Sequence, residues 1–130
     1  MLDVDEPEVA MARWRCVPRV GQVAWTARSI RSFALRHGMR STACAPTMHA
    51  VSEVMEYASS SACPHDVDVE AASDGDWLTV IVRGCGHRDG DGASAHATAV
   101  SVADRVEWHA AGEDMAVVME FRARGRDCWS

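Results

Sequence analysis

Apolar residues in the first half of the chain recur every three or four positions, the spacing of a helix with one buried side. Two such segments are expected. The first runs from Pro18 to Arg36, is followed by Gly38 as its end signal, and has the stripe Val20, Val23, Ala24, Ala27, Ile30 and Ala34. The second begins near Pro46 or Thr47, ends near the serines at 59–61, and has the stripe Met48, Val51, Met55, Ala58 and Ala62.

Apolar and polar residues alternate one by one further along, which is the pattern of a half-buried strand. Val67, Val69 and Ala71 alternate with acidic residues, a Ser-Asp-Gly-Asp turn follows at 73–76, and Trp77 to Arg83 forms the second strand of a hairpin. A turn centred on residues 74–75 pairs positions whose numbers sum to about 149–150. Extending this ladder places His65 opposite Cys85.

The remaining segments complete a regular order of elements. We expect a strand over residues 13–17, a weaker alanine-rich helix over 93–104, a strand over 106–110 and a last strand over 115–124 with Val117, Met119 and Phe121 on its buried side. This order predicts an α/β (α+β) two-layer sandwich, in which a mixed, mostly antiparallel sheet has its helices packed on one face. Residues 1–12 are interpreted as a flexible acidic arm, 13–124 as one domain and 125–130 as a tail.

Composition narrows the classes of function. The 130 residues carry a net charge of −6, which argues against general nucleic-acid binding. All 13 basic residues are Arg, so mechanisms that need Lys are excluded. No apolar run reaches the roughly 20 residues of a membrane span, and no signal peptide is recognised, so a cytoplasmic protein is expected. Five cysteines without a CxxC pair favour buried thiols over a disulfide framework.

Three local sequences carry a resemblance to a known family. Residues 50–58 read AVSEVMEYA, residues 74–83 read DGDWLTVIVR, and residues 103–106 read ADRV. In this order they resemble the N-box helix, the hairpin before the G1 box and the ADRW segment of the GHKL (Bergerat-fold, HATPase_c-like) superfamily. Within it, the chain looks most similar to the bacterial anti-sigma-factor serine kinases. The resemblance implies a Bergerat-like fold.

The resemblance also implies which residues would bind ATP and magnesium. Glu53 matches the family's catalytic Glu, but Tyr57 stands where an Asn would hold Mg²⁺. Gly84 replaces the Asp that would accept the adenine amino proton, and Ala93-Ser94-Ala95 replaces a glycine-rich turn. The pocket at Tyr57, Gly84 and Gly86 is therefore predicted to be degenerate, with ATP and Mg²⁺ binding lost, Glu53 vestigial and no catalytic residue.

Several of these residues have alternative interpretations. Glu53 is either a remaining catalytic group or an ordinary solvated or ion-paired acid, and Tyr57 either fills the vacated pocket or packs at its edge. The extended hairpin brings Cys63 and His65 toward Cys85 and His87, a set that suits tetrahedral Zn²⁺. Redox pairing of Cys63 with Cys85, or ordinary loop and core roles, are the alternatives to metal.

The sequence therefore favours a non-catalytic regulator that controls transcription through protein–protein binding. The resemblance implies a sigma factor or an anti-anti-sigma-type antagonist as partner, and allows a homodimer; neither nucleic acid nor membrane is expected as a partner. The arginines at 28, 31 and 36 are interpreted as a solvated face or a partner surface. An active ATP-dependent serine kinase and a zinc or thiol sensor on the same scaffold are the alternatives.

Overall fold

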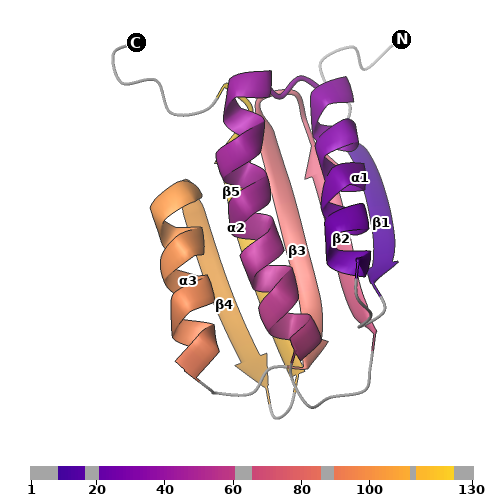
Figure 1. The fold of residues 1–130 in the computed structure, drawn as a ribbon. Helices are drawn as coiled ribbons and strands as arrows, with labels where there is room; N and C mark the ends of the chain where they lie inside the picture. The colour runs from indigo at the N-terminus through magenta and orange to yellow at the C-terminus, as the bar shows by residue number, and fades with distance from the viewer. Residues whose placement is uncertain (1–8, 17–20, 61–65, 86–89, 112–113, 125–130) are drawn as a thin grey trace, which may run out of the picture.

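The fold is an antiparallel sheet with helices on one face (Figure 1). The computed structural model describes residues 9–16, 21–60, 66–85, 90–111 and 114–124. Within them the elements follow the order β1 (Ala10–Cys16), α1 (Gln22–Arg36), α2 (Ser41–Ser60), β2 (Val67–Ser73), β3 (Trp77–Cys85), α3 (Gly90–Val102), β4 (Arg105–Ala111) and β5 (Asp114–Arg122).

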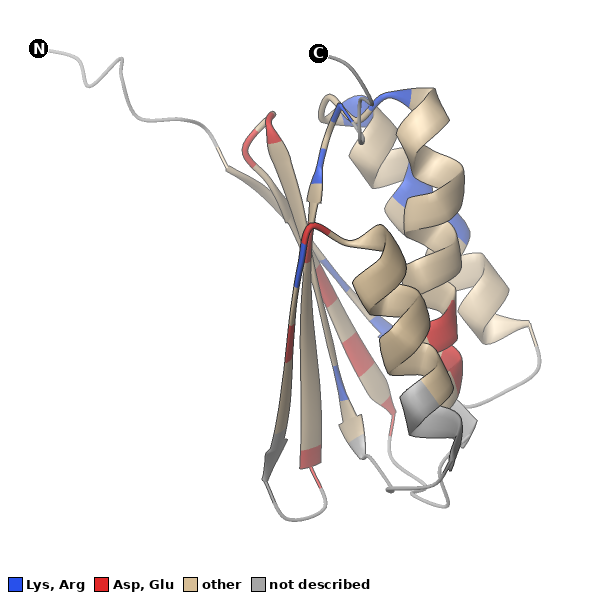
Figure 2. Cartoon of the chain, turned by 90° about the vertical axis from the view of Figure 1, so that its left-hand side faces the viewer, with Lys and Arg blue, Asp and Glu red and all other residues tan. Residues whose placement is uncertain are grey.

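The five strands form one sheet in the order β1-β2-β3-β5-β4. Figure 2 shows the helices on one side of this sheet and its other side uncovered. The predicted α+β class, element order and two-layer architecture are confirmed. The sheet is more regular than predicted, because every described strand pair is antiparallel. The strand β1 also begins at Ala10, inside the segment predicted as a loose arm.

Helix α1 buries a stripe that is rotated slightly from the predicted one. Its buried side chains are Thr26, Ala27, Ile30, Phe33 and Ala34. Ala24, predicted to be part of the stripe, is exposed instead. The helix ends as predicted at Arg36, and the φ of 109° at Gly38, two residues later, lies in the left-handed region. The amide of Met39 donates to the carbonyl of Ala34 across 2.9 Å, which closes the end of the helix.

Helix α2 begins at Ser41, before the predicted start, and contains Pro46 in its second turn. Proline removes the donor that the carbonyl of Thr42 would use, but both residues are exposed, so water can reach this carbonyl. Tertiary contacts hold the first turn in place. The amide of Arg40 donates to the carbonyl of Ala123 across 2.9 Å, and the side chain of Cys44 is fully buried. Packing therefore overrides the local stop signal of the proline.

The β2–β3 hairpin has a different register from the predicted one. Val69 pairs with Val82 and Ser73 with Leu78, so paired numbers sum to 151. The amide of Asp74 donates to the carbonyl of Trp77 across 3.3 Å, which leaves residues 75–76 as the loop. Two features fix this turn. Gly75 has a φ of 97°, and the Asp74 carboxylate accepts the amides of Asp76 and Trp77 at 2.9 and 2.8 Å.

The α1–α2 connection is fastened to this hairpin. The hydroxyl of Ser73, a buried residue, donates to the carbonyl of His37 across 3.1 Å and accepts the amide of Gly75 across 3.3 Å. A Cβ atom on Gly38 would lie only 3.2 Å from the carbonyl oxygen of Gly75. The two turns can approach so closely because residue 38 is a glycine.

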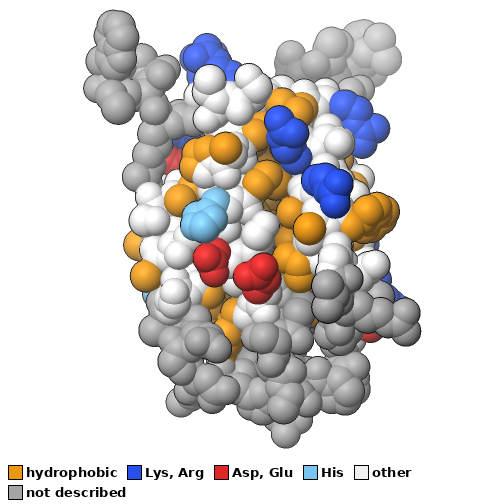
Figure 3. Space-filling view, viewed as in Figure 1, with side chains coloured by type: hydrophobic (Ala, Val, Ile, Leu, Met, Phe, Trp, Pro, Cys, Tyr) orange, Lys and Arg blue, Asp and Glu red, His pale blue; other side chains and the backbone are white. Residues whose placement is uncertain are grey.

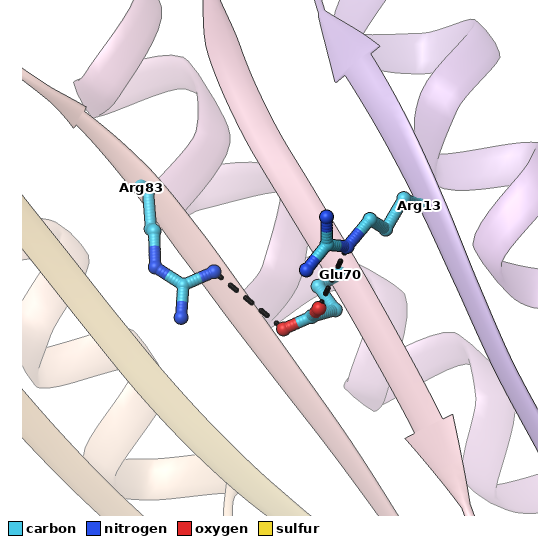
Figure 4. Close-up of polar contacts among 3 residues, drawn as sticks. All are labelled: Arg13, Glu70 and Arg83. Carbon is cyan, nitrogen blue, oxygen red and sulfur yellow. Dashed lines mark hydrogen bonds and ion pairs between the residues drawn. The ribbon is translucent and has the colours of Figure 1, made fainter.

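The uncovered face of the sheet carries charged side chains in cross-strand contact. Figure 4 shows Glu70 of β2 between Arg13 of β1 and Arg83 of β3. The Glu70 carboxylate accepts from Arg13 at 2.8 Å and from Arg83 at 3.5 Å, and its side chain is only 12% exposed. The hydrogen bond from Arg13 is the main cause that lowers the pKa of Glu70 below its usual range. This group links three strands on the side that no helix covers.

Candidate functional site

Helix α2 carries Glu53 and Tyr57 one turn apart. The family resemblance would give the Glu53 position the role of activating a nucleophile and the Tyr57 position the role of binding magnesium. Glu53 is partly exposed and lies one turn after His49, whose Nε2 is 3.9 Å from its Oε1. Because the two residues are separated by four positions, they lie on the same side of the helix. The structure therefore places Glu53 in a long i,i+4 contact on the helix surface.

Tyr57 lies in an aromatic cluster between α2, β4 and α3. It is 8% exposed, and its ring centroid is 5.8 Å from that of Trp108 on β4. His96 of α3 meets Trp108 edge-on, at a centroid distance of 5.3 Å. Aromatic pairs in these geometries add to the stabilisation gained by burial. Tyr57 thus packs side by side with a neighbouring ring at the position where the resemblance would require an Asn.

Gly84 lies at the end of β3, opposite Met115 of β5. A Cβ atom built on it would meet the Ala58 methyl at 3.4 Å and Cγ2 of Val67 at 3.5 Å. Both neighbours are buried, with exposures of 3% and 1%. The position expected to carry a carboxylate therefore has no side chain of its own, and two buried apolar groups lie next to it. The segment Ala93-Ser94-Ala95, which stands where the resemblance would require a glycine-rich turn, is part of helix α3, and the methyl of Ala95 is in the core.

The proposed Cys/His cluster lies mostly outside the described residues. Cys63, His65, Gly86 and His87 are not described, and Cys85 is described only as the last residue of β3. The predicted strand pairing from which their proximity was extrapolated is wrong, because paired residue numbers sum to 151 in the structure and not to 149–150. A shift of one position exchanges the two faces of a strand. Among the described residues, no group of three or more metal-ligating side chains is found.

The burial of two of the five cysteines is described, and both match the predicted buried role. Cys16 and Cys44 form no disulfide within the described residues and have no exposed surface. Burial raises the pKa of the Cys44 thiol, and the nearby Arg31 guanidinium opposes this shift only in part. A buried thiol with a raised pKa stays protonated and is a poor nucleophile. These two residues therefore serve as small apolar groups in the core.

The outer side of α1 combines arginines with large apolar side chains. We call the residues Trp25, Arg28, Arg31, Leu35 and Arg36 the α1 face. All five are exposed, with 55% for Trp25 and 39% for Leu35. Within the described part of the chain, none of the three arginines forms an ion pair with a carboxylate, and α1 itself contains no acidic residue. Figure 3 shows basic side chains over this helix and acidic ones over the lower part of α2.

Comparisons with known proteins add no assignment. No protein-family model matches the chain, and a search of curated proteins finds no match either. Among the described helices, none combines the length and apolar character that a membrane crossing requires.

Some contacts at this site were not anticipated from the sequence. The tilted ring contact between Tyr57 and Trp108 joins residues far apart in the chain, and no local pattern signals it. A weak signal existed for Trp108, because the strand alternation of β4 places a large ring on one face. The exposure of Trp25 could be anticipated only from its position opposite the buried stripe of α1.

Proposed function

We propose that this protein is a non-catalytic regulator on a degenerate Bergerat-like domain, which acts by binding another protein and not by binding ATP. The observation that carries the proposal is the apolar surroundings of Gly84, a position without a side chain. The neighbouring methyl groups of Ala58 and Val67 lie 3.4 and 3.5 Å from where its Cβ would be, and no carboxylate is available there to accept an adenine amino proton.

The other positions implied by the resemblance support the same conclusion. A Mg²⁺ ion prefers oxygen ligands in near-octahedral geometry, and the ring of Tyr57 is held against Trp108 instead. A phosphate would need close approach of backbone amides, but the segment that would supply them is part of α3, with the Ala95 methyl in the core. Glu53 alone supplies none of these contacts. Nucleotide chemistry is therefore not the function that this geometry favours.

The α1 face supports the binding of a protein partner. Arginine and tryptophan are the side chains most enriched among residues that dominate binding energy at interfaces. Here three arginines that form no ion pair with a described carboxylate share one helix with the exposed Trp25 and Leu35, and this helix has no acidic residues. On a chain with a net charge of −6, such a concentrated positive surface suits an acidic partner. From the resemblance, we propose a sigma factor or its anti-sigma antagonist as this partner.

Isothermal titration with Mg·ATP tests the proposed loss of nucleotide binding. We expect no magnesium-dependent heat of binding, and micromolar binding that requires magnesium would refute the proposal. If ATP binds without magnesium, the variants Glu53→Ala and Arg40→Gln show where it binds. Glu53 belongs to the predicted nucleotide region, whereas Arg40 lies at the other end of α2. Sensitivity to Glu53→Ala would count against a degenerate site, whereas sensitivity to Arg40→Gln alone would locate the contact elsewhere.

Partner binding is tested by co-purification from native cells with a charge-reversed variant of the α1 face. Arg28→Glu is expected to lose a partner that the wild-type chain retains. Arg105→Glu is the matched control, because Arg105 is equally an exposed arginine but lies on β4. Equal retention by both variants would show that the α1 face is not the binding surface.

A further inference from the structure

A pocket lies at the end of the molecule where α2 begins, distinct from the Glu53 and Tyr57 region. Its volume is about 440 Å³, and it is bordered by the start of α2, the end of α3, the turn between α3 and β4, and the end of β5. The lining residues that matter for its chemistry are Arg40, Thr42, Thr47, Asp104, Arg122 and Arg124. Three of these six are arginines, so the character of the pocket is basic.

Two of the arginines are available to a ligand. Arg40 and Arg124 form no ion pair with any carboxylate in the described part of the chain, and both are exposed. The third, Arg122, places its guanidinium over the ring of Trp77, 5.4 Å from the centroid. The acid in the wall, Asp104, accepts the backbone amide of Arg122 across 2.9 Å. The pocket wall thus combines the Asp104 carboxylate, which already accepts a backbone hydrogen bond, with the guanidinium groups of Arg40 and Arg124.

The start of α2 adds to the positive potential. The first amides of a helix have no acceptor within it, and together they act as a partial positive charge. An acidic side chain usually lies in this first turn, but α2 has none there. Instead Arg40 directly precedes the helix, and its carbonyl accepts the amide of Ala43 across 2.9 Å. A cation beside a positive helix end is unfavourable unless an anion lies between them.

A buried threonine gives an independent indication of a ligand. Thr47 lines the pocket and is only 3% exposed. No described residue forms a hydrogen bond with its hydroxyl, and this oxygen, unlike Oγ1 of the fully buried Thr26, is not sealed inside the core. An oxygen atom of a ligand in the pocket would satisfy this donor.

From these features we infer that the pocket binds a phosphate group. A tetrahedral dianion can accept hydrogen bonds from two guanidinium groups, from helix amides and from a hydroxyl at the same time. The volume also leaves room for more than the phosphate itself. The source is either free phosphate or a phosphorylated side chain, which share this chemistry. The inference is independent of the proposed function, because none of these residues belongs to the degenerate nucleotide region.

Titration of the full chain with inorganic phosphate, at constant ionic strength and followed by ¹H–¹⁵N NMR, tests the inference. We expect saturable shifts of the amides of residues 41–47. Arg40→Gln and Arg124→Gln should each weaken binding by about tenfold, the effect of one hydrogen bond to a charged group. Thr47→Val should weaken it less. Arg36→Gln is the matched control, since it removes an exposed arginine of α1 outside the pocket, and it should leave binding unchanged.

The two sources are separated by comparing O-phosphoserine with phosphate and with serine. Tighter binding of O-phosphoserine than of phosphate identifies a phosphorylated side chain, and equal binding identifies the free ion. The inference is overturned if no saturable shift occurs up to about 10 mM phosphate, or if Arg36→Gln weakens binding as much as the pocket variants. Arg124 follows the last strand, so its variant remains informative if Arg40→Gln perturbs the start of α2.

Discussion

Replacing Gly84 by Ala tests directly how the end of β3 packs against α2. A methyl group on Gly84 would lie 3.4 Å from the Ala58 methyl and 3.5 Å from Cγ2 of Val67, which is ordinary van der Waals contact. The position does not have a positive φ, so alanine can adopt its backbone conformation without strain. The substitution is therefore expected to stabilise the fold.

The expected gain in the free energy of unfolding has two parts. Restricting the unfolded chain by a Gly-to-Ala change contributes about 0.4–1 kcal/mol. Placing one methyl group against two buried neighbours adds at most about 0.8 kcal/mol. Gly84 is partly exposed, so we expect a total near 1 kcal/mol, which raises the melting temperature by about 4 °C. Urea unfolding followed by circular dichroism measures this difference, and an unchanged m-value shows that the two-state transition is preserved.

Gly38→Ala is the matched control. Its φ of 109° and the 3.2 Å approach to the Gly75 carbonyl oxygen make alanine unfavourable there, with an expected loss of about 2 kcal/mol. A loss of stability in Gly84→Ala would contradict the described packing. Gly84→Asp extends the test to function, because a variant with a carboxylate next to two buried apolar groups should be less stable than the alanine variant. If Gly84→Asp were as stable as Gly84→Ala and also bound Mg·ATP, the nucleotide region would be open. The proposed loss of ATP binding would then depend on residue 84 alone.

Two further predictions concern polar groups away from this site. Thr26 is fully buried and its hydroxyl has no partner among the described residues, so Thr26→Val should stabilise the chain by about 1 kcal/mol in urea unfolding; a comparable loss would reveal a hydrogen bond that the described geometry lacks. Because the pKa of Glu70 is lowered in the folded state, its contribution to stability is present above its usual pKa and is lost as the pH falls through the folded value. Glu70→Gln should therefore cost up to about 1 kcal/mol at pH 7 and progressively less as the pH falls through the folded-state pKa, and a cost that stays constant down to the acid-unfolding range would exclude the ionised carboxylate as the cause.

The order of elements was predictable from the sequence because each element follows its own local period. Val117, Met119 and Phe121 alternate in β5 as expected and are all buried. The start of α2 was not predictable, because Pro46 is a strong local signal and the contact that overrides it, between Arg40 and Ala123, joins distant parts of the chain. Propensity is a weak prior when tertiary contacts compete with it.

The candidate site was predictable only where it depends on residue identity. That Tyr57 and Gly84 lack the chemistry of a magnesium ligand and an adenine acceptor follows from their side chains alone. Where Tyr57 points depends on Trp108, which no local pattern connects to it. The predicted hairpin register was wrong by one or two positions, because the loop consists of residues 75–76 and Gly75 has a positive φ that the residue pattern alone did not indicate.

The order of strands in the sheet has a consequence for how the chain is made. The strand β1 leaves the ribosome first, yet Arg13 pairs with Glu70, 57 residues later. The central strand β3 then has β2 on one side, but its other edge is open until β5 has been synthesised. An unpaired central edge is a template for association with other chains, and pairing across such separations is slow. Nascent chains that stall before β5 are therefore expected to be the species most in need of a chaperone.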